Sequence, residues 1–452
     1  MPSRVTSMTR TGILDHLPML RPLRHRDFRL LWTGMTVSLL GDGVFLVALA
    51  WQVYSLSNAP TALAVVGLAI SLPHVAFLLV GGMVSDRVDR RRVMVLADAL
   101  RGTAIAAIGV LSVTGALRFG PLLALAGIYG AGSAFFGPAF DAIVPELVPG
   151  DALAEANSLD QFVRPTALRL IGPALGGWLI AAAGTGPAFL IDAGTFLASI
   201  ATLLLMKRPA TGRWDEAAAP PLSDIVEGIR FVRGQVWLWG TFLAAAVAYL
   251  LFMGPVEVLL PYVVKNDLHR GAGVLGFVFA MGGLGAISGA VVMGRRGMPR
   301  RHITFMYVSW TLATLAVAGY GLARFPWQVM LASFVFYALE TVGTIVWSTT
   351  KHQRVPLHLL GRVSSLDWFI SIGLLPLSFA LTGPVAAALG PRGTLVWAGV
   401  LGGGVTMAGL FLPGMRNGEV DLAADRVVDQ DVASNVRPAS GHQAVLDLVV
   451  QG

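Results

Sequence analysis

The sequence predicts an all-α integral membrane protein in which twelve transmembrane helices form two pseudo-symmetric six-helix bundles. Three observations predict this fold. Hydrophobic residues make up 55% of the 452 residues and charged residues only 13%, about half of the ~25% that is typical of soluble globular proteins. Apolar stretches of roughly 20 residues recur along the chain, and each is long enough to cross the ~30 Å hydrocarbon layer of a bilayer as a helix. Prolines and glycines also recur at a common spacing in the two halves.

Apolar runs and the residues that interrupt them define the predicted spans. The first six lie at residues 30–55, 62–84, 93–114, 121–143, 162–183 and 187–206. The second six lie at residues 237–263, 272–294, 302–322, 326–350, 366–388 and 392–412. The predicted domains are therefore a cytoplasmic N-terminal segment (1–29), an N-terminal bundle (30–206), a cytoplasmic linker (207–236), a C-terminal bundle (237–413) and a cytoplasmic tail (414–452).

The linker and the tail differ from the spans in composition. Within the linker, apolar residues recur at helical spacing between charged residues over 224–233, which is typical of a helix lying on a membrane surface. The tail is polar and has no sustained period, so we expect it to be largely disordered.

Lysine and arginine set the predicted orientation, because they concentrate in cytoplasmic loops. With a cytoplasmic N-terminus, the outer loops hold only five of the 33 Lys and Arg residues, namely Arg118, Lys265, Arg270, Arg324 and Arg392. The first apolar run is too long for a signal peptide and is interpreted as a retained span. The sequence therefore predicts a multi-pass protein of the cell membrane with both termini in the cytoplasm.

Pro and Gly positions indicate that the second half repeats the first. At a fixed offset of 211 residues, Val144-Pro145 falls on Val355-Pro356, Gly150 on Gly361, Pro165 on Pro376, and Gly172-Pro173 on Gly383-Pro384. Each of these residues alone is common in membrane helices, so the prediction rests on their shared spacing.

The stretch "GGMVSDRVDRRRVM" (81–94) places a dense group of charges between the second and third spans. Arginines in a short cytoplasmic loop fix topology, but this role does not account for Gly82 or Asp86. Gly82 would let two helices approach closely. Asp86 would bind a helix N-terminus or an arginine of a neighbouring element.

This stretch resembles the loop motif G-x-x-x-D-[RK]-x-G-[RK]-[RK] of the major facilitator superfamily. The matching residues are Gly82, Asp86, Arg87, Arg90 and Arg91, with Asp89 in place of the second glycine. "FFGPAFDAIVPELV", "RVPLHLLGRVSSLDW" and "FLIDAGTFLAS" are similar to its proton-driven drug exporter branch, which includes macrolide and siderophore efflux proteins. The resemblance covers all twelve spans. It implies that Asp86 and Arg90 help to latch the two halves in an outward-facing state, whereas the corresponding loop "MGRRGMPRRH" (293–302) has no acid.

A second motif lies in the fifth span. "GPALGG" (172–177), with Gly172, Pro173, Gly176 and Gly177, is similar to the end of the glycine-proline motif of the family's antiporters, although Leu168 replaces another glycine of that motif. It predicts a kinkable helix whose small-residue face packs against the other half. The alternative is that these residues have no special role, since Gly and Pro are common in membrane helices.

Three carboxylates and one arginine inside the spans are the candidate site. An ionised side chain at a helix centre costs about 2.5–3.5 kcal/mol or more, so it requires a partner, water or a function. Asp42, Glu257 and Glu340 lie in spans one, seven and ten, which line the central cavity in the superfamily. Each could carry protons, bind a cationic substrate, or hold an arginine. Arg169 in span five has no acid nearby in sequence; its partner is either Asp42 or an anionic group of the substrate.

Two other acids receive structural interpretations. Asp98 and Arg101, three residues apart, are expected to share a helix face and neutralise each other. Asp192 is expected to cap the start of span six.

Several classes of function are excluded. No cysteine is present, and none of the three lysines follows a glycine, so there is no Walker site. "GAGVLG" (271–276) follows a membrane helix rather than a strand and does not indicate a dinucleotide site. No metal, cofactor or catalytic residue is expected, and the protein is not expected to be an enzyme. The net charge of +7 lies in short loops and does not indicate nucleic-acid binding.

The sequence thus predicts a secondary transporter that works by alternating access. We expect it to export amphipathic small molecules such as drugs, antibiotics or siderophores, driven by inward proton flow, and to function as a monomer whose partners are the bilayer, the substrate and protons. The alternatives are an importer or facilitator of the same fold, and a membrane receptor or scaffold that transports nothing.

Overall fold

The computed structural model describes residues 18–149, 152–207, 222–417 and 419, and within these ranges all regular secondary structure is helical. Eleven helical stretches are long and apolar enough to cross a membrane. The last of them, Phe369–Gly409, has 41 residues, which is room for two spans of about 20 residues each. Gly390 interrupts it with a φ of 73°, a left-handed conformation that only glycine adopts without strain. The structure therefore contains the twelve spans that the sequence predicts.

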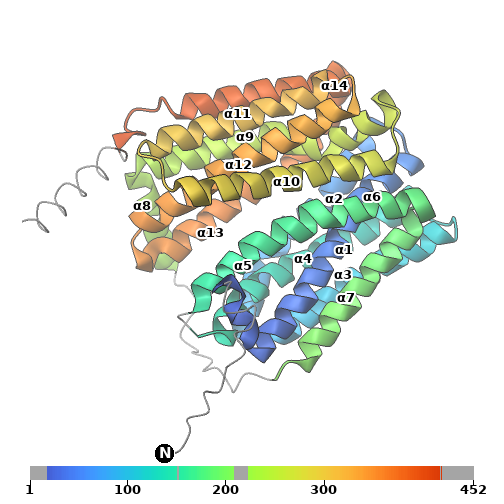
Figure 1. The fold of residues 1–452 in the computed structure, drawn as a ribbon, viewed down its shortest axis with the longest axis horizontal. Helices are drawn as coiled ribbons and strands as arrows, with labels where there is room; N and C mark the ends of the chain where they lie inside the picture. Colours follow the sequence, from blue (N-terminus) through green and yellow to red (C-terminus); the bar gives the residue numbers. More distant parts are fainter. Residues whose placement is uncertain (1–17, 150–151, 208–221, 418, 420–452) are drawn as a thin grey trace, which may run out of the picture.

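Two bundles make up the molecule (Figure 1). The first contains η2 (Pro18–Arg24), α1 (Arg26–Leu56), α2 (Pro60–Arg87), α3 (Arg90–Val113), α4 (Phe119–Leu147), α5 (Leu153–Pro165), η4 (Thr166–Ile171), α6 (Gly172–Ala183) and α7 (Thr185–Leu205). The second contains α8 (Leu222–Gly234), α9 (Val236–Tyr262), η5 (Val263–Asp267), α10 (Ala272–Arg296), α11 (His302–Leu322), α12 (Pro326–Arg354), α13 (Leu357–Gly373) and α14 (Leu375–Gly409).

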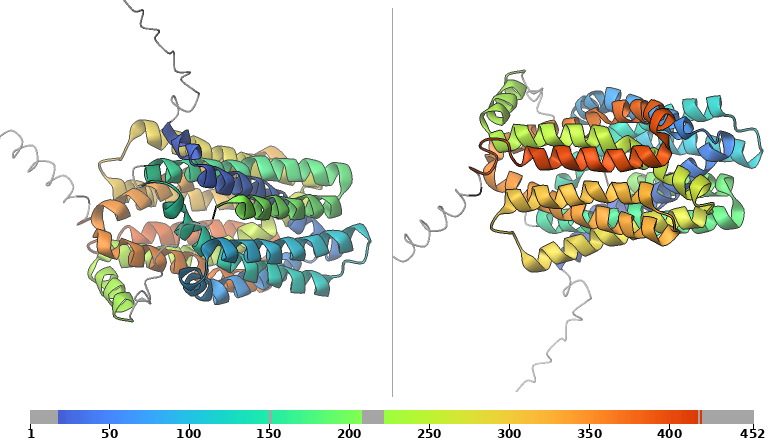
Figure 2. Two further views of the ribbon diagram at one scale, coloured as in Figure 1. Left: turned by 90° about the horizontal axis from the view of Figure 1, so that it is seen from below. Right: turned by 90° about the horizontal axis from the view of Figure 1, so that it is seen from above.

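The long helices of both bundles run along one common direction in the two side views (Figure 2). In the first bundle α7 packs on α1 and α3, and α4 on α2 and α3. In the second, α14 packs on α9 and α11, and α12 on α10 and α11. α8 contacts α9 and α13 and forms a helix where the sequence predicts a surface helix. Most of the predicted tail, and residues 1–17 of the N-terminal segment, lie outside the described residues.

The connection between spans two and three is shorter than predicted. α2 continues to Arg87 and α3 begins at Arg90, so two residues link them instead of the predicted eight or so. Asp89 makes this sharp junction possible as the N-cap of α3, because its carboxylate accepts hydrogen bonds from the backbone N–H groups of Arg91 and Arg92 at 3.0 and 3.4 Å. The charged residues therefore extend the two helices and do not form a loop.

Span five has the predicted bounds, Phe162–Ala183, but it is less regular than predicted, because it combines the end of α5 with η4 and α6. η4 is a π-helical segment in which the Gly172 N–H bonds to the Ala167 carbonyl, five residues back. Pro173 follows and has no N–H to offer the Arg169 carbonyl four residues earlier, which disfavours α-helical pairing at this point. The wide turn places Arg169 in the middle of the span, and π-helical turns of this kind are frequent at functional sites.

The two halves meet at the end of the molecule that carries the turns after Leu56, Ala183 and Asp267; we call it the contact end. There the Tyr54 hydroxyl donates to the Val258 carbonyl at 2.7 Å, and the Lys265 ammonium donates to the Tyr54 carbonyl. The rings of Tyr54 and Tyr262 pack edge to face with centroids 5.5 Å apart. Each of these contacts joins α1 to α9 or η5, so they close the space between the halves at this end.

Glycines bring two further helices together across the halves. A Cβ atom on Gly276 of α10 would lie 2.4 Å from the Pro173 carbonyl oxygen, and one on Gly177 of α6 would lie 3.0 Å from the Gly276 Cα. The backbones of α6 and α10 are therefore in direct contact, as in other membrane helix pairs with small residues at the interface. Between α2 and α14, which also belong to different halves, Gly67 makes room for a side chain instead: it packs against the ring of Phe379.

The contact between α6 and α10 predicts opposite effects for two glycines that lie one helical turn apart. Gly276→Ala should separate the two helices and lower the free energy of unfolding by about 1–3 kcal/mol. Gly273→Ala is the matched control, because its Cβ would lie 3.9 Å from the nearest neighbour; it should be neutral or stabilise the helix by up to ~1 kcal/mol. Thermal unfolding of both purified variants measures the difference, and equal melting temperatures would contradict the close contact.

Candidate transport site

Arg169 extends from the N-terminal half to the C-terminal half. Its guanidinium carbon lies 4.7 Å from the centre of the Tyr337 ring on α12, which is cation–π distance. It also interacts electrostatically with Glu340 on α12 and Glu257 on α9. Its backbone is held close to the other half, because a Cβ on Gly283 of α10 would lie 2.7 Å from the Arg169 carbonyl carbon. Three of the predicted site residues thus lie near one another across the two halves. We call them the cross-half cluster: Arg169, Glu257 and Glu340.

The cross-half cluster borders a space that solvent can reach. Arg169 and Glu257 are both exposed, and Glu340 is half-buried. All three lie well inside their spans, and the arginine faces the carboxylates of the opposite half. Side chains that face each other and are still exposed must line an opening between the halves. In the described part of the chain neither carboxylate forms an ion pair, and Glu340 accepts a hydrogen bond from the Thr344 hydroxyl at 3.0 Å.

Asp42 belongs to a different group of side chains. It is half-buried in α1, and the Tyr129 hydroxyl of α4 donates to it at 3.1 Å. The cations that interact with it are Arg101 and Arg164. Asp42 as the partner of Arg169, one of the two alternatives from the sequence, is therefore wrong: the arginine faces the two glutamates. Sequence distance could not distinguish these possibilities, because all the acids concerned are more than 80 residues from Arg169.

Asp98 and Arg101 form a buried ion pair on α3, which confirms the structural interpretation of this pair. Asp98 is 0% exposed and also accepts a hydrogen bond from the Ser199 hydroxyl of α7 at 2.7 Å. The Arg101 guanidinium lies over the ring of Phe136 at 4.4 Å and over that of Phe196 at 4.8 Å. A buried charge that lost such a partner would remain without compensation in a low-dielectric surrounding.

Asp192 is a site residue that sequence reasoning missed. Capping was expected, but α7 begins at Thr185, so Asp192 lies about two turns inside the helix and is 0% exposed. One carboxylate oxygen accepts from the Thr195 hydroxyl at 3.3 Å, while the other has no hydrogen-bond partner within the described residues. A Cβ on Gly41 would lie 2.3 Å from this carboxylate. Asp192 therefore packs beside Asp42 and interacts with it electrostatically.

Two arginines of the predicted gating motif, Arg90 and Arg91, bind groups of their own half. Arg90 donates to the Ala142 carbonyl at 2.9 Å and pairs with Glu146 on α4. Arg91 donates to the carbonyls of Met206 and Leu204 at 2.9 and 2.6 Å. These bonds tie the start of α3 to the ends of α4 and α7. The side chain of Asp86 lies outside the described residues, and Arg87, the last residue of α2, is exposed.

Close helix packing in this region occurs one residue earlier than expected. A Cβ on Gly82 would meet nothing within 4 Å, so the predicted close approach at Gly82 is wrong. A Cβ on Gly81 would lie 2.4 Å from the Ala134 carbonyl oxygen of α4. Gly82 matches the glycine of the motif, but its neighbour Gly81 is the glycine that faces α4.

The antiporter-like motif lies between the two halves. Gly172 packs on the backbone of Gly43, and Gly176 on that of Val44, both in α1. Gly177 faces the other half through α10, as described above. The small-residue face of α6 thus contacts α1 on one side and α10 on the other.

No three His, Asp or Glu side chains gather as a metal site would require in the ranges that the structure describes. The ionisable groups instead form the cross-half cluster and the network of Asp42, Asp98, Arg101 and Asp192. This arrangement suits the binding of charged solutes and the transfer of protons.

Two ion pairs of unlike burial should respond differently to the same substitution. Asp98→Asn should reduce the free energy of unfolding by about 3–5 kcal/mol, because it leaves the buried Arg101 without its partner. Asp160→Asn removes the carboxylate of the Arg164–Asp160 pair, a 3.0 Å contact within one helix whose side chains are 42% and 22% exposed, and should cost only about 0.3–1 kcal/mol. Thermal unfolding of the purified proteins compares them; a mild effect of Asp98→Asn would contradict a structural role.

Solved structures share this fold. A bacterial homologue of the iron transporter ferroportin in an inward-facing state matches with a TM-score of 0.60 at 16% identity, covering 85% of this chain and 98% of that chain. A bacterial homologue of the human lysosomal transporter Spinster, also inward-facing, matches with a TM-score of 0.58 at 16% identity, covering 88% and 96%. At this level of identity the likeness concerns the fold alone.

Sequence relatives are similar over nearly their whole length. The multidrug efflux pump Tap of Mycolicibacterium fortuitum is 29% identical over 396 residues, covering 85% of this chain and 94% of that protein. The enterobactin exporter EntS of Citrobacter koseri is 28% identical over 417 residues, covering 90% and 95%. A family model described as transmembrane secretion effector matches residues 18–448. The chain therefore belongs to the transmembrane secretion effector family of the major facilitator superfamily, a group of membrane transporters rather than enzymes.

Proposed function

We propose that this protein exports amphipathic small molecules from the cytoplasm by proton antiport, through alternating access. The observation that carries the proposal is the cross-half cluster: an arginine of one half and two glutamates of the other border a solvent-accessible space within the membrane spans. Charges in this setting are costly, and in membrane proteins they mark the path of a substrate or ion. The names of the two relatives, a multidrug efflux pump and an enterobactin exporter, support the direction of transport.

The distribution of lysine and arginine supports an orientation. In the proposed orientation, both termini and α8 lie in the cytoplasm of a cell-membrane protein and the contact end lies outside, because Lys and Arg concentrate in cytoplasmic loops. In this orientation the structure is closed to the exterior at Tyr54 and Lys265, and the cross-half cluster receives its substrate from the cytoplasmic side. Export then requires the contact end to open and the cytoplasmic ends to close.

During this transition, contacts at the contact end would break and contacts at the cytoplasmic ends would form. Opening the contact end breaks the bonds of Tyr54 and Lys265 and moves α6 along α10. Closing the cytoplasmic ends would engage the gating motif, where the resemblance assigns a latch to Asp86 and Arg90. Arg90 is held by α4 in the present conformation, so a latch would have to form in addition to this bond or replace it.

Asp42 is the proposed proton carrier. It forms no ion pair within the described residues, and the buried Asp192 lies beside it with an unbonded carboxylate oxygen. Two neighbouring carboxyl groups in a low-dielectric region cannot both be ionised without a large cost, so together they favour retention of one proton. Arg101 interacts electrostatically with Asp42, so its positive charge would help to stabilise the Asp42 carboxylate after the proton leaves.

Everted membrane vesicles test the proposed direction and driving force. Vesicles that contain the protein should accumulate a fluorescent amphipathic drug when acidified inside, and a protonophore should abolish the accumulation. Vesicles without the protein are the control. Flux that only equilibrates and ignores the protonophore would indicate a facilitator instead. Failure to move any member of a broad compound panel, with a protein partner co-purifying, would favour a scaffold.

Asp42 should couple the proton gradient to transport. Asp42→Asn should abolish the dependence of export on the pH gradient while leaving membrane insertion intact, because the amide cannot exchange a proton. Asp42→Glu is the matched variant, since it restores a carboxyl group, and it should retain pH-dependent export. The measurement is substrate-driven proton movement in reconstituted liposomes. Undiminished proton movement with Asp42→Asn would remove Asp42 from the coupling role.

A further inference from the structure

The first residues of the predicted tail are folded against the C-terminal half. After α14 the chain turns at Gly414, whose φ is 88°, a conformation that favours glycine. The next side chain, Met415, is 0% exposed and belongs to a hydrophobic cluster that contains Trp237 at the start of α9. A Cβ on Gly240 of α9 would lie 2.6 Å from the Met415 Cε. The absence of a side chain at Gly240 therefore makes the space that Met415 fills.

Glu419 binds the start of α11. One of its carboxylate oxygens accepts from the Thr304 backbone N–H at 2.6 Å, and the other accepts from the Thr304 hydroxyl at 3.2 Å. Thr304 is the third residue of α11, so its N–H is one of the first four that have no partner within a helix. Arg301, the residue before α11, makes no side-chain cap bond. Glu419 therefore supplies the cap, with a negative charge at the positive end of the helix dipole.

The tail supplies to the second half what the first half has in its own loop. α2 and α10 are the second spans of their halves, each contacts the opposite half, and they lead into α3 and α11. Asp89 caps α3, as described above. At the offset of 211 residues that relates the halves, Asp89 falls on Arg300, and the loop 293–302 contains no acid. The acid missing from this second loop is thus provided by Glu419.

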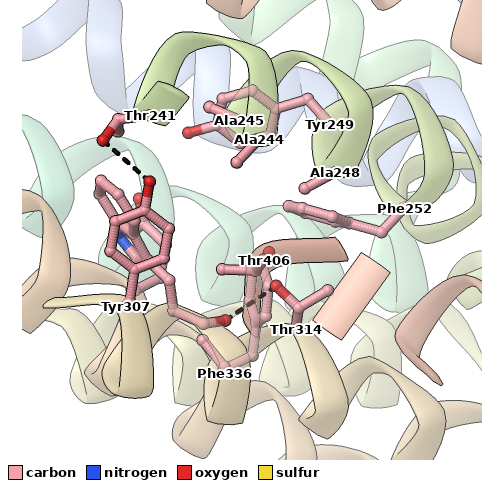
Figure 3. A pocket seen from close by; sticks show the side chains of 13 residues that line it. Thr241, Ala244, Ala245, Ala248, Tyr249, Phe252, Tyr307, Thr314, Phe336 and Thr406 are labelled. Carbon is pink, nitrogen blue, oxygen red and sulfur yellow. Dashed lines mark hydrogen bonds between the residues drawn. The ribbon is translucent and has the colours of Figure 1, made fainter. Parts of the chain in front are cut away.

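Met415 and Glu419, which we call the tail anchor, join two helices that have little direct contact. In their second turns, Thr241 of α9 and Tyr307 of α11 share a hydrogen bond of 2.9 Å (Figure 3). Farther along, a pocket lies between α9, α11 and α12 (Figure 3), so close packing does not continue from this bond. Met415 packs on α9 and Glu419 binds α11 at the same end of the pair. The tail anchor therefore holds these two helix ends together.

We propose that Glu419 is a positioning residue for the cytoplasmic gate. It fixes the start of α11 and, through residues 297–301, the end of α10, which is a helix that contacts the N-terminal half. The contacts between the halves described above lie at the contact end and within the spans. Fraying of the first turn of α11 therefore costs no contact between the halves in this conformation.

Closing the cytoplasmic ends changes this balance, because an ordered loop between α10 and α11 is then needed to meet the other half. The tail anchor thus favours the conformation that is closed to the cytoplasm and open at the contact end, since it stabilises what only that conformation uses. This assignment rests on the proposed alternating access and adds the tail as a part of its gate.

Hydrogen–deuterium exchange of the purified full-length protein tests the bond itself, by mass spectrometry of peptides that contain Thr304. Glu419→Ala should raise the exchange rate of the Thr304 amide about fivefold or more, the equilibrium factor for the loss of a helix cap. Asn417→Ala is the matched control, because Asn417 is exposed in the same segment; it should exchange as the wild type does. Adding Arg301→Asp to Glu419→Ala should restore protection, since it supplies an acid at the N-cap of α11, as Asp89 does for α3.

The lysines report on the gate at the opposite end of the molecule. Lys265 is half-buried at the contact end and donates to the Tyr54 carbonyl, so its amine is released when that end opens. The chain has only three lysines, and mass spectrometry after brief reaction with an N-hydroxysuccinimide ester resolves each of them. Glu419→Ala should lower the labelling of Lys265 about two- to fivefold relative to the exposed Lys207, and Arg301→Asp should restore it.

A cap that stabilised only the start of α11 would leave the labelling of Lys265 unchanged. The proposal is therefore overturned if the labelling of Lys265 stays at the wild-type level while the Thr304 amide exchanges faster. It is equally overturned if exchange at Thr304 is unchanged in a folded Glu419→Ala protein. If Glu419→Ala does not fold, Glu419→Gln takes its place in both measurements; it keeps an acceptor oxygen, removes only the charge, and should give smaller changes in the same directions.

The outcome for the gate is separable from the outcome for export. Neither measurement requires a transported substrate, so wild-type vesicles that accumulate no drug would refute the proposed export and leave both results for Glu419 unaffected. A wild-type protein in which Lys265 never reacts would contradict the opening of the contact end, and with it the proposed role of Glu419.

Discussion

The structure depends on the cost of placing an ionised side chain in hydrocarbon, about 2.5–3.5 kcal/mol or more at the centre of a span. Every charged residue within the spans must therefore be neutralised or reach water. The chain uses both solutions. Asp98 and Arg101 are neutralised by pairing inside the N-terminal half, whereas Arg169 and Glu257 are exposed between the halves. A solvent-accessible space within the spans is thus a requirement of the sequence itself.

The charged residues within the spans do not follow the internal repeat of the chain, although the helix contacts do. The offset of 211 residues relates span five to span eleven, and the contacts follow the same relation. Span five contacts span eight, as α6 on α10, while span eleven contacts span two, as the first part of α14 on α2. The ionisable groups do not follow it: Asp98 and Arg101 form a buried pair in the first half, and the second half presents Glu257 and Glu340 to the opening. The internal repeat determines which helices pack together, whereas the ionisable side chains differ between the two halves.

The spans and the helix-breaking residues were predictable because hydropathy is a local property of the chain. Gly390, for example, separates two apolar runs that are recognisable in the sequence. The partner of Arg169 was not predictable, since it depends on how α12 lies against η4, and these segments are far apart in the chain. The prediction that Asp192 caps a helix was wrong for a related reason. Its position relative to the start of α7 suggested a cap, and only the packing of α7 on Gly41 shows that its carboxylate is enclosed. The π-helical turn at Thr166–Ile171 also had only an indirect signal, the nearby Pro173.

The contact of Gly276 with Pro173 and Gly177 involves backbone atoms on both sides. Interlocked side chains form ridges and grooves that hold two helices in register, and moving such helices requires each ridge to rise out of its groove. α6 and α10 present nearly smooth surfaces to each other at this point. The proposed movement of α6 along α10 would therefore meet little resistance at this point, at the same glycines that hold the two halves in contact.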